Sequence, residues 1–405
     1  MQSAMTHQES LVELVKNDIK INEALQQITV EYRGTEALDA AAMQQLVAAC
    51  GDHGLKVEVL RDGNNKVISI SNTEHAVGVI VQLGMKDIEA LVVTKQLYPA
   101  KWLPVIYKDS SEIVMDRMDR KNEVKTKMAR HRTLMEFCPG DIKKLAIANS
   151  QLPVEERDQI YASVANVARQ MADILTEIND KEIMWPDMKP DNILFRLNGE
   201  VVICDTKPFR RIENLDRVTK TNAAGEEYKI FKFHDMTTHF ISPDGQSRLF
   251  TIPERDRKKL LEIWKREYSY QLAIVLYRVA TGDLTDPERN INNDDKYEMT
   301  FDFNHPIFQA GAGRKLQAIL EHMTKPNPKE RLDCSAAARK LKKLILPVAV
   351  KSPRAGKSPR AISPRSAVSP KTTSQRSASR LFEAEVTPPM RMGTHRGSAN
   401  KAQKK

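Results

Sequence analysis

Cysteine is scarce and scattered in this chain. The 405 residues include 4 cysteines, and none of them stands in a CxxC pair or at a metal-ligand spacing from histidine: Cys50, Cys138, Cys204 and Cys334. This distribution excludes a disulfide framework and gives no sign of a structural zinc site. Isolated thiols are typical of proteins from a reducing compartment, and we therefore expect a cytoplasmic location.

Long apolar runs are absent as well. No stretch of eighteen apolar residues occurs, so the sequence predicts no membrane span. The first twenty residues lack the basic start, apolar stretch and small-residue cleavage site of a signal peptide, and we expect no Sec-type export. Hydrophobic residues make up 41% and charged residues 29% of the chain, which excludes a collagen-like or fully disordered protein. The length allows two or three globular units plus tails.

Positive charge is concentrated at the C-terminus. The net charge is +10, and residues 351–405 alone hold 13 Lys and Arg against 2 acidic residues. The motifs KSPR, KSPR, ISPR and VSPK recur there, and such a composition buries too little apolar surface to fold. We expect residues 347–405 to form a disordered basic tail that binds anionic membrane. Nucleic-acid binding is disfavoured because Phe382 is the tail's one stacking aromatic side chain.

The remainder divides into a β-rich part and a helical part. Apolar periodicity predicts two helices, at 8–28 and 36–50, in an N-terminal extension over residues 1–54. Short β-branched runs then predict the strands of an antiparallel sheet, at 55–60, 66–71, 76–83 and 90–97.

Helical patterns dominate after residue 140. They occupy 155–178, 259–281, 313–323 and 335–345. Strands first and helices second predict an α+β fold, with a small β-rich lobe over residues 55–134 and a larger helical lobe over residues 135–346.

The centre of the chain carries the strongest chemical signal. Residues 185–194, Trp-Pro-Asp-Met-Lys-Pro-Asp-Asn-Ile-Leu, resemble the catalytic loop H-R-D-L-K-P-x-N-I-L of protein kinases. A buried-type strand at 201–203 leads to Asp205, which resembles the D-F-G aspartate. The resemblance implies a bilobal protein-kinase fold in which Asp187 and Lys189 are catalytic and Asn192 and Asp205 bind Mg²⁺ or Mn²⁺.

Further motifs follow in the family's order. Ala90–Lys95 resembles the V-A-I-K strand, which implies that Lys95 contacts the ATP phosphates, and residues 73–80 take the place of the Gly-rich loop. Residues 134–141 resemble the hinge that holds adenine. The ATP-binding residues implied in this way are Gly78, Ile80, Lys95, Glu112, Met135, Glu136 and Cys138.

The resemblance also implies two ion pairs. One lies in the helical part, and the other involves a helix expected at 111–132. Glu254 and Arg331 resemble the A-P-E and D-P-x-x-R residues, which implies a structural ion pair. The helix partner of Lys95 is assigned to Glu112, with Asp116 and Glu123 as competitors. The same predicted helix is dense in cations that form either a solvated face or a site for an inositol polyphosphate or phosphoinositide: Arg117, Arg120, Lys121, Lys125, Lys127, Arg130 and Arg132.

The departures from the family pattern affect regulation and packing. Trp185-Pro186 replaces His-Arg, Thr206-Lys207 replaces Phe-Gly, and Tyr268 replaces an aspartate of the central helix. The sequence is identified as a divergent Ser/Thr protein kinase that acts on proteins with ATP and is activated by a polyanion. It is similar to the effector kinases that bacteria of the Legionella type deliver into host cells, where peripheral membrane association is expected. A pseudokinase scaffold and a small-molecule or lipid kinase stay as alternatives.

Overall fold

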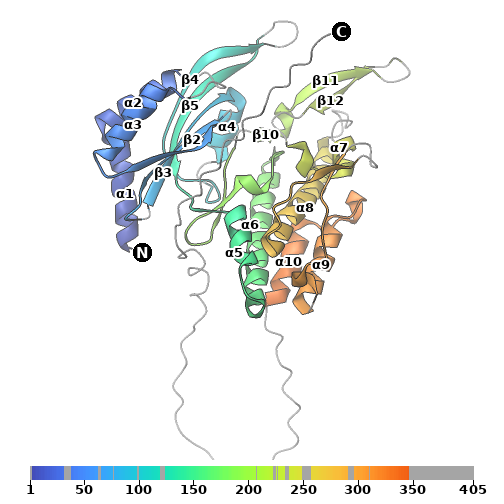
Figure 1. Ribbon diagram of the computed structural model, residues 1–405. Helices are drawn as coiled ribbons and strands as arrows, with labels where there is room; N and C mark the ends of the chain where they lie inside the picture. The colour runs from blue at the N-terminus through green and yellow to red at the C-terminus, as the bar shows by residue number, and fades with distance from the viewer. Residues whose placement is uncertain are drawn as a thin grey trace, which may run out of the picture. The chain divides into compact units, whose positions relative to one another are not determined.

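The structure of the protein is a computed structural model. It describes residues 2–31, 38–62, 65–75, 77–97, 100–118, 124–206, 208–221, 225, 227–232, 237–248, 257–290, 296–309 and 311–345. The expected basic tail, 347–405, lies outside these residues. The described part mixes α and β structure, with one antiparallel sheet and several helices (Figure 1). This composition is compatible with a two-lobed fold.

The main sheet has five antiparallel strands. In spatial order they are β1 (Lys56–Asp62), β2 (Asn65–Asn72), β3 (Val77–Asp87), β5 (Val124–Glu136) and β4 (Ile106–Met118). The first three confirm the strands predicted from the β-branched runs. Successive side chains of a strand point to opposite faces, so each strand of the sheet contributes to two different environments.

Three N-terminal helices pack against one face of this sheet: α1 (Gln2–Asn17), α2 (Ile19–Glu31) and α3 (Ala40–Gly51). Val79, Val81 and Leu83 of β3 form one hydrophobic cluster with Leu11 and Leu46 from the helices, and all five side chains are buried. Figure 1 shows the three helices together on this side of the sheet. The helices and the sheet therefore share a core.

Residues 90–97 form a helix, not the predicted strand. They belong to α4 (Ile88–Leu97), whose buried side chains are Val93, Thr94 and Leu97. Positions i, i+1 and i+4 lie on one side of a helix, so the β-branched residues serve helical packing here. The prediction failed because short apolar runs fit both periods.

The helix predicted for residues 111–132 is also wrong. Its described residues, 111–118 and 124–132, belong to β4 and β5, which pair with each other in antiparallel register. On β5, His131 and Thr133 are buried, while Arg130 and Arg132 occupy the alternate positions. A period of two therefore accommodates the dense cations, which would repel one another at i and i+4 in a helix.

The second half of the chain is mainly helical. The four helices predicted after residue 140 are confirmed by α6, α8, α9 and α10. The helices are α5 (Ile142–Ser150), α6 (Arg157–Asp180), α7 (Pro243–Arg248), α8 (Arg257–Thr281), α9 (Gly311–Met323) and α10 (Cys334–Ile345). No helix in the described ranges is both long enough and apolar enough to cross a membrane.

Short strands and turns connect these helices. The strands are β6 (Gly140–Asp141), β7 (Ile183–Met184), β8 (Ile193–Phe195), β9 (Val201–Ile203), β10 (Arg210–Arg211), β11 (Asp216–Thr221), β12 (Glu227–Lys232), β13 (Glu288–Asn290) and β14 (Lys296–Glu298). The 3₁₀ turns are η1 (Val154–Glu156), η2 (Pro190–Asn192), η3 (Ile212–Asn214), η4 (Thr238–Phe240), η6 (Pro306–Phe308) and η7 (Pro328–Glu330). The β6-β8-β9 sheet holds the two segments that carry the predicted catalytic residues.

Candidate active site

The loop between β7 and β8 brings three predicted residues together. Asp187 is 6% exposed and Asn192 is fully buried. The Asn192 amide donates to Asp187 Oδ2 and to the Asp187 carbonyl, each at 2.9 Å. Lys189 Nζ lies 3.0 Å from Asp187 Oδ2. The turn η2 returns the chain within five residues, so this part of the site is built by local geometry.

Thr237 completes the cluster from a distant part of the chain. Its backbone N–H donates to Asp187 Oδ1 at 3.0 Å, and its hydroxyl makes a second hydrogen bond to the same oxygen. Lys189 Nζ also donates to the Thr237 hydroxyl at 2.8 Å. The sequence analysis missed Thr237 because 50 residues separate it from Asp187 and no periodic pattern marks it.

Asp205 lies two residues beyond β9 in an unusual backbone conformation. Its φ angle is +56°, in the left-handed region that non-glycine residues rarely adopt. The preceding residue is tied to the loop between β7 and β8, because Cys204 N donates to the Asn192 carbonyl at 3.0 Å. A left-handed aspartate held beside a buried polar cluster is typical of functional sites.

The donor set fits a magnesium or manganese ion. Hard divalent cations prefer carboxylate and amide oxygens. Asn192 Oδ1 is buried and has no hydrogen-bond partner among the described residues, so it is available to a cation. The described residues contain no cluster of three or more His, Cys, Asp or Glu side chains spaced for a metal. Asn192 and Asp205 are the residues that would hold such an ion.

The residue after Asp205 connects the site to α4. Thr206 is buried and accepts a hydrogen bond from the Thr94 hydroxyl of α4 at 3.0 Å. A second tie joins Arg211 of β10 to Gln96 of α4, with N···O distances of 3.0 and 2.7 Å. Polar contacts therefore join α4 to the segment after Asp205. In the family pattern, phenylalanine takes the place of Thr206.

Helix α8 holds the loop between β7 and β8 through a tyrosine. The Trp185 N–H donates to the Tyr268 hydroxyl at 2.8 Å, and both side chains are buried. Burial raises the pKa of Tyr268, so its hydroxyl stays protonated. The phenol therefore fixes the backbone two residues before Asp187.

We expect the Tyr268→Phe variant to lower catalytic turnover about tenfold, equivalent to about 1.4 kcal/mol in the barrier. Removing the hydroxyl leaves the buried backbone N–H of Trp185 without an acceptor and loosens the loop that carries Asp187. Tyr270→Phe is the matched control, because the Tyr270 hydroxyl accepts from Met299 N at 3.2 Å away from the loop. Steady-state kinetics on both variants test this, and equal turnover would contradict it.

Arg331 forms a buried ion pair with Glu267. Its Nη1 lies 2.9 Å from Glu267 Oε1 of α8, and both side chains are almost completely buried. Glu254 lies outside the described residues. Glu267 also accepts from Ser242 N and from the Ser242 hydroxyl, at 3.0 and 2.9 Å. A buried guanidinium needs a carboxylate at contact distance, and α8 supplies one.

Burial and pairing act on Glu267 in opposite directions. Removal from water raises the pKa of Glu267, whereas Arg331 and the two Ser242 hydrogen bonds act to lower it. The same carboxylate therefore anchors both Arg331 and the segment that follows Thr237. With Tyr268 next to it, α8 contacts both segments that meet at Asp187.

Three predicted nucleotide-binding residues lie near one another at the end of β5. Met135 pairs with Ile80 of β3 in register, and Glu136 ends the strand. Cys138 follows two residues later. Burial raises the pKa of Cys138 to about 12, and the nearby Glu136 adds to this, so its thiol is a poor nucleophile.

Gly78 lies within β3 and not in a phosphate-binding loop. Its N–H and carbonyl are hydrogen bonded to the Gln8 side chain of α1, at 3.2 and 2.8 Å. A Cβ atom at this position would meet the Phe137 ring at 3.2 Å. The turn preceding β3 ends before this residue, and the glycine is required for close packing. The expectation of a Gly-rich loop at 73–80 is therefore wrong.

Lys95 and Glu112 have other partners. Lys95 projects from α4 with its side chain 60% exposed, and its Nζ is 3.8 Å from Asp109 Oδ2. Glu112 is a residue of β4, 73% exposed, and lies 4.0 Å from Arg130. The strand position that was assigned to Lys95 is therefore wrong. The strand β3 has its own lysine, Lys86, opposite Ala129 of β5.

The cations assigned to a polyanion site lie along β4 and β5. Arg117, Lys125 and Lys127 are strand residues, and Arg120 and Lys121 lie outside the described residues. Arg132 Nη1 is buried and has no hydrogen-bond partner among the described residues. Burial lowers the pKa of Arg132. The described members of this group therefore lie on strands and not on the predicted helix.

Comparison with known proteins places part of the chain near protein kinases. No protein family model matches it. Serine/threonine-protein kinase SCH9 of Candida albicans is 23% identical over 189 residues, which is 46% of this chain and 20% of that protein. Serine/threonine-protein kinase RUNKEL of Arabidopsis thaliana is 28% identical over 96 residues, which is 24% of this chain and 6% of that protein. The chain thus spans a fifth or less of these relatives. The similarity indicates a kinase-like relationship.

Proposed function

We propose that this protein is an atypical Ser/Thr protein kinase that transfers the γ-phosphate of ATP to protein hydroxyl groups. The observation that carries the proposal is the polar cluster of Asp187, Lys189, Asn192 and Thr237, in which a nearly buried carboxylate faces a lysine and an amide. Similarity to Ser/Thr protein kinases supports the same conclusion.

Each residue of the cluster has a role in this reaction. Asp187 orients the substrate hydroxyl and accepts its proton as the new O–P bond forms and the bond from the γ-phosphorus to ADP breaks. Lys189 stabilises the negative charge on the transferred group. Asn192 and Asp205 hold Mg²⁺ or Mn²⁺, which neutralises the phosphates when bound. Thr237 keeps Asp187 and Lys189 in position.

The nucleotide is proposed to lie between the end of β5 and this cluster. Ile80, Met135, Glu136 and Cys138 then surround the base. We further propose lobes of residues 55–134 and 135–346, with the helices of residues 1–54 packed on the first and a disordered tail, 347–405.

A pseudokinase scaffold is the second candidate. It is favoured by Gly78, which lies within β3 with its backbone bound to Gln8 and so forms no part of a free phosphate-binding loop. Such a protein would bind nucleotide weakly or not at all. A small-molecule or lipid kinase is less favoured, since Lys189 follows Asp187 in the pattern of protein kinases.

Radiolabelled ATP and a generic protein substrate distinguish these candidates. We expect label transfer to serine or threonine with Mg²⁺ or Mn²⁺ and complete loss of transfer with EDTA. Nucleotide binding without transfer would favour the pseudokinase. Label on lipid or small molecules but not on protein would favour the third class.

Anionic partners are proposed at two places. The basic residues of β4 and β5 are proposed to bind an inositol polyphosphate or phosphoinositide that raises activity. The tail is proposed to associate with anionic membrane, in the cytoplasm or, for an effector delivered by a bacterium, in the host cytoplasm. The tail carries four Ser-Pro sites whose phosphorylation would add about −1.5 to −2 charge each: Ser352, Ser358, Ser363 and Ser369.

We expect deletion of residues 351–405 to reduce binding to phosphatidylserine vesicles and to leave catalysis unchanged. The +11 charge of this segment supplies about 1 kcal/mol of attraction per well-placed cation, which salt screens. Vesicle co-sedimentation at two salt concentrations measures this.

A paired Lys125→Glu and Arg130→Glu variant should keep vesicle binding but lose stimulation by inositol hexakisphosphate. Unchanged sedimentation of the truncated protein, or unchanged stimulation of the variant, would contradict the respective site.

A further inference from the structure

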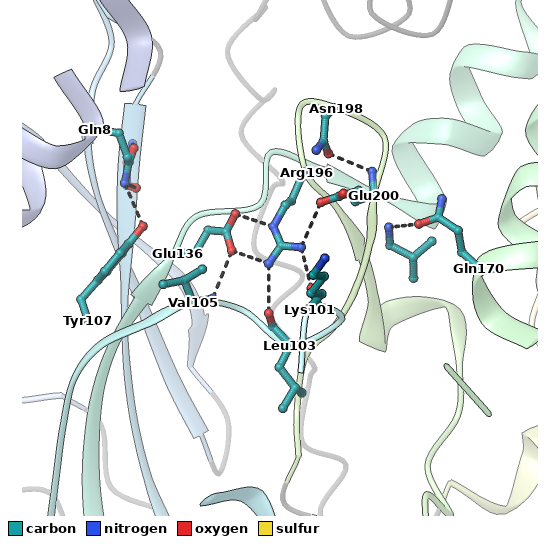
Figure 2. A network of polar contacts seen from close by, with 12 residues as sticks. Gln8, Lys101, Leu103, Val105, Tyr107, Glu136, Gln170, Arg196, Asn198 and Glu200 are labelled. Carbon is teal, nitrogen blue, oxygen red and sulfur yellow. Dashed lines mark hydrogen bonds and ion pairs between the residues drawn. The ribbon is translucent and has the colours of Figure 1, made fainter. Parts of the chain in front are cut away.

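Arg196, which follows β8, makes hydrogen bonds with all five of its guanidinium N–H groups. Nε donates to Glu136 Oε1 at 2.8 Å, and Nη2 donates to Glu136 Oε2 at 2.9 Å and to the Leu103 carbonyl at 3.0 Å. Nη1 donates to the Lys101 carbonyl at 2.7 Å and to Glu200 at 3.4 Å. Figure 2 shows the guanidinium at the centre of these groups. Five N–H donors therefore have five acceptors.

The segment between α4 and β4 is held by three successive carbonyls. Arg196 binds those of Lys101 and Leu103, and the Ile203 N–H of β9 donates to the Trp102 carbonyl at 2.8 Å. The Trp102 indole N–H also donates to Glu177 of α6 at 2.7 Å. Residues 101–103 are consequently fixed to the part of the chain that carries the catalytic loop.

Glu136 connects this arrangement to the end of β5. Its Oε2 accepts from Val105 N at 3.1 Å, and its own N–H donates to the Val105 carbonyl at 2.8 Å. The side chains of Arg196 and Glu136 are 16% and 18% exposed, so water competes weakly for the bidentate pair. Arg196, Glu136 and the carbonyls of Lys101 and Leu103 are called the Arg196 clasp below.

We propose that the Arg196 clasp positions the backbone of residues 135–138 for nucleotide binding. This inference rests on the proposed kinase function. The clasp makes Arg196 a positioning residue, because it acts through Glu136. A site fixed before the ligand arrives avoids the entropy cost of ordering it on binding. Asp187 and Asn192 are held by separate contacts, so loosening the clasp should weaken nucleotide binding and leave the chemical step unchanged.

The test is the Arg196→Lys variant of the full chain, with Arg278→Lys as matched control. Lysine keeps the charge but has three N–H donors on one atom, so it cannot serve the five acceptors that Arg196 binds. Arg278 is similarly buried and binds Asp286 and the Thr285 carbonyl, each at 2.8 Å. Calorimetric titration with a non-hydrolysable Mg·ATP analogue and steady-state kinetics are measured on all three proteins. We expect the Kd and KM for nucleotide to rise about tenfold in Arg196→Lys, with kcat within twofold of wild type.

Local hydrogen exchange provides an independent readout. Exchange should rise in peptides covering residues 101–106 and 134–138 of Arg196→Lys and stay unchanged in Arg278→Lys. Unaltered affinity in Arg196→Lys, or a fall in kcat at constant KM, would overturn the positioning role while the kinase proposal stands. Absence of nucleotide binding by the wild-type protein would overturn both. If Arg196→Lys fails to fold, Glu136→Gln takes its place, with a smaller rise in KM expected.

Discussion

An Asp187→Asn variant is expected to lose about 10²–10⁴-fold in kcat. Asparagine matches the shape of aspartate and still offers an oxygen to Thr237 N. It cannot accept the proton of the attacking hydroxyl, and it removes the carboxylate that lies 3.0 Å from Lys189 Nζ. The expected change in melting temperature is small, because the packing of this nearly buried position is retained.

The matched control for this prediction is Asp191→Asn. Asp191 lies in η2 of the same loop, and its side chain is exposed. Initial-rate measurements with saturating ATP should show near wild-type activity for the control. Asp205→Ala should abolish transfer through loss of the metal ligand. Activity of Asp187→Asn within tenfold of wild type would remove Asp187 from the catalytic role.

An Arg331→Met variant is expected to lose about 3–5 kcal/mol of folding stability. Methionine fills the volume of the arginine side chain but leaves the buried Glu267 carboxylate without its cation. Glu267 then keeps only its hydrogen bonds from Ser242 among the contacts described above. The corresponding fall in melting temperature is roughly 6–20 °C. Nucleotide affinity at temperatures where the variant is folded should stay close to wild type, because Arg331 contacts no residue of the polar cluster.

The exposed pair of Lys325 and Glu330 provides the control. Its side chains are 39% and 53% exposed at a distance of 3.1 Å, so Glu330→Gln should leave the melting temperature close to wild type. Combining Arg331→Met with Glu267→Gln should recover part of the loss, since no uncompensated charge is left. Calorimetric melting of the three variants measures these differences. Equal melting of Arg331→Met and Glu330→Gln would exclude the buried pair as a main source of stability.

The buried ion pair of Arg331 and Glu267 shows what a sequence motif can and cannot predict. The resemblance pointed to a structural role for Arg331, and the structure places its side chain in the core. Its ion-pair partner among the described residues is Glu267 of α8, whereas the partner implied by the resemblance, Glu254, lies outside them. Sequence order contains little information on such a choice when 64 residues separate the partners.

The clearest error in the predicted secondary structure concerns the basic stretch 111–132, for which a helix was predicted. Residues 111–132 combine charges with Ile113, Val114 and Val124, and their spacing fits a helix or a strand. The strands formed because β3 offers a partner for β5, and β5 in turn pairs with β4. Preference for a strand depends on cross-strand neighbours, which a single segment does not reveal.

The sequence by itself determined the elements whose parts are close in the chain: the helices after residue 140, three strands of the sheet, and the loop in which Asp187, Lys189 and Asn192 meet. Short loops restrict the backbone so strongly that residue types and spacing suffice there. Only the tertiary structure decided that Thr237 and Tyr268 join this loop, that the Gly78 backbone binds the Gln8 side chain of α1, and that Arg196 holds Glu136. Each of these contacts closes a long loop of chain. Its formation depends on the burial of the whole core, and the residues on either side carry no local signal of it.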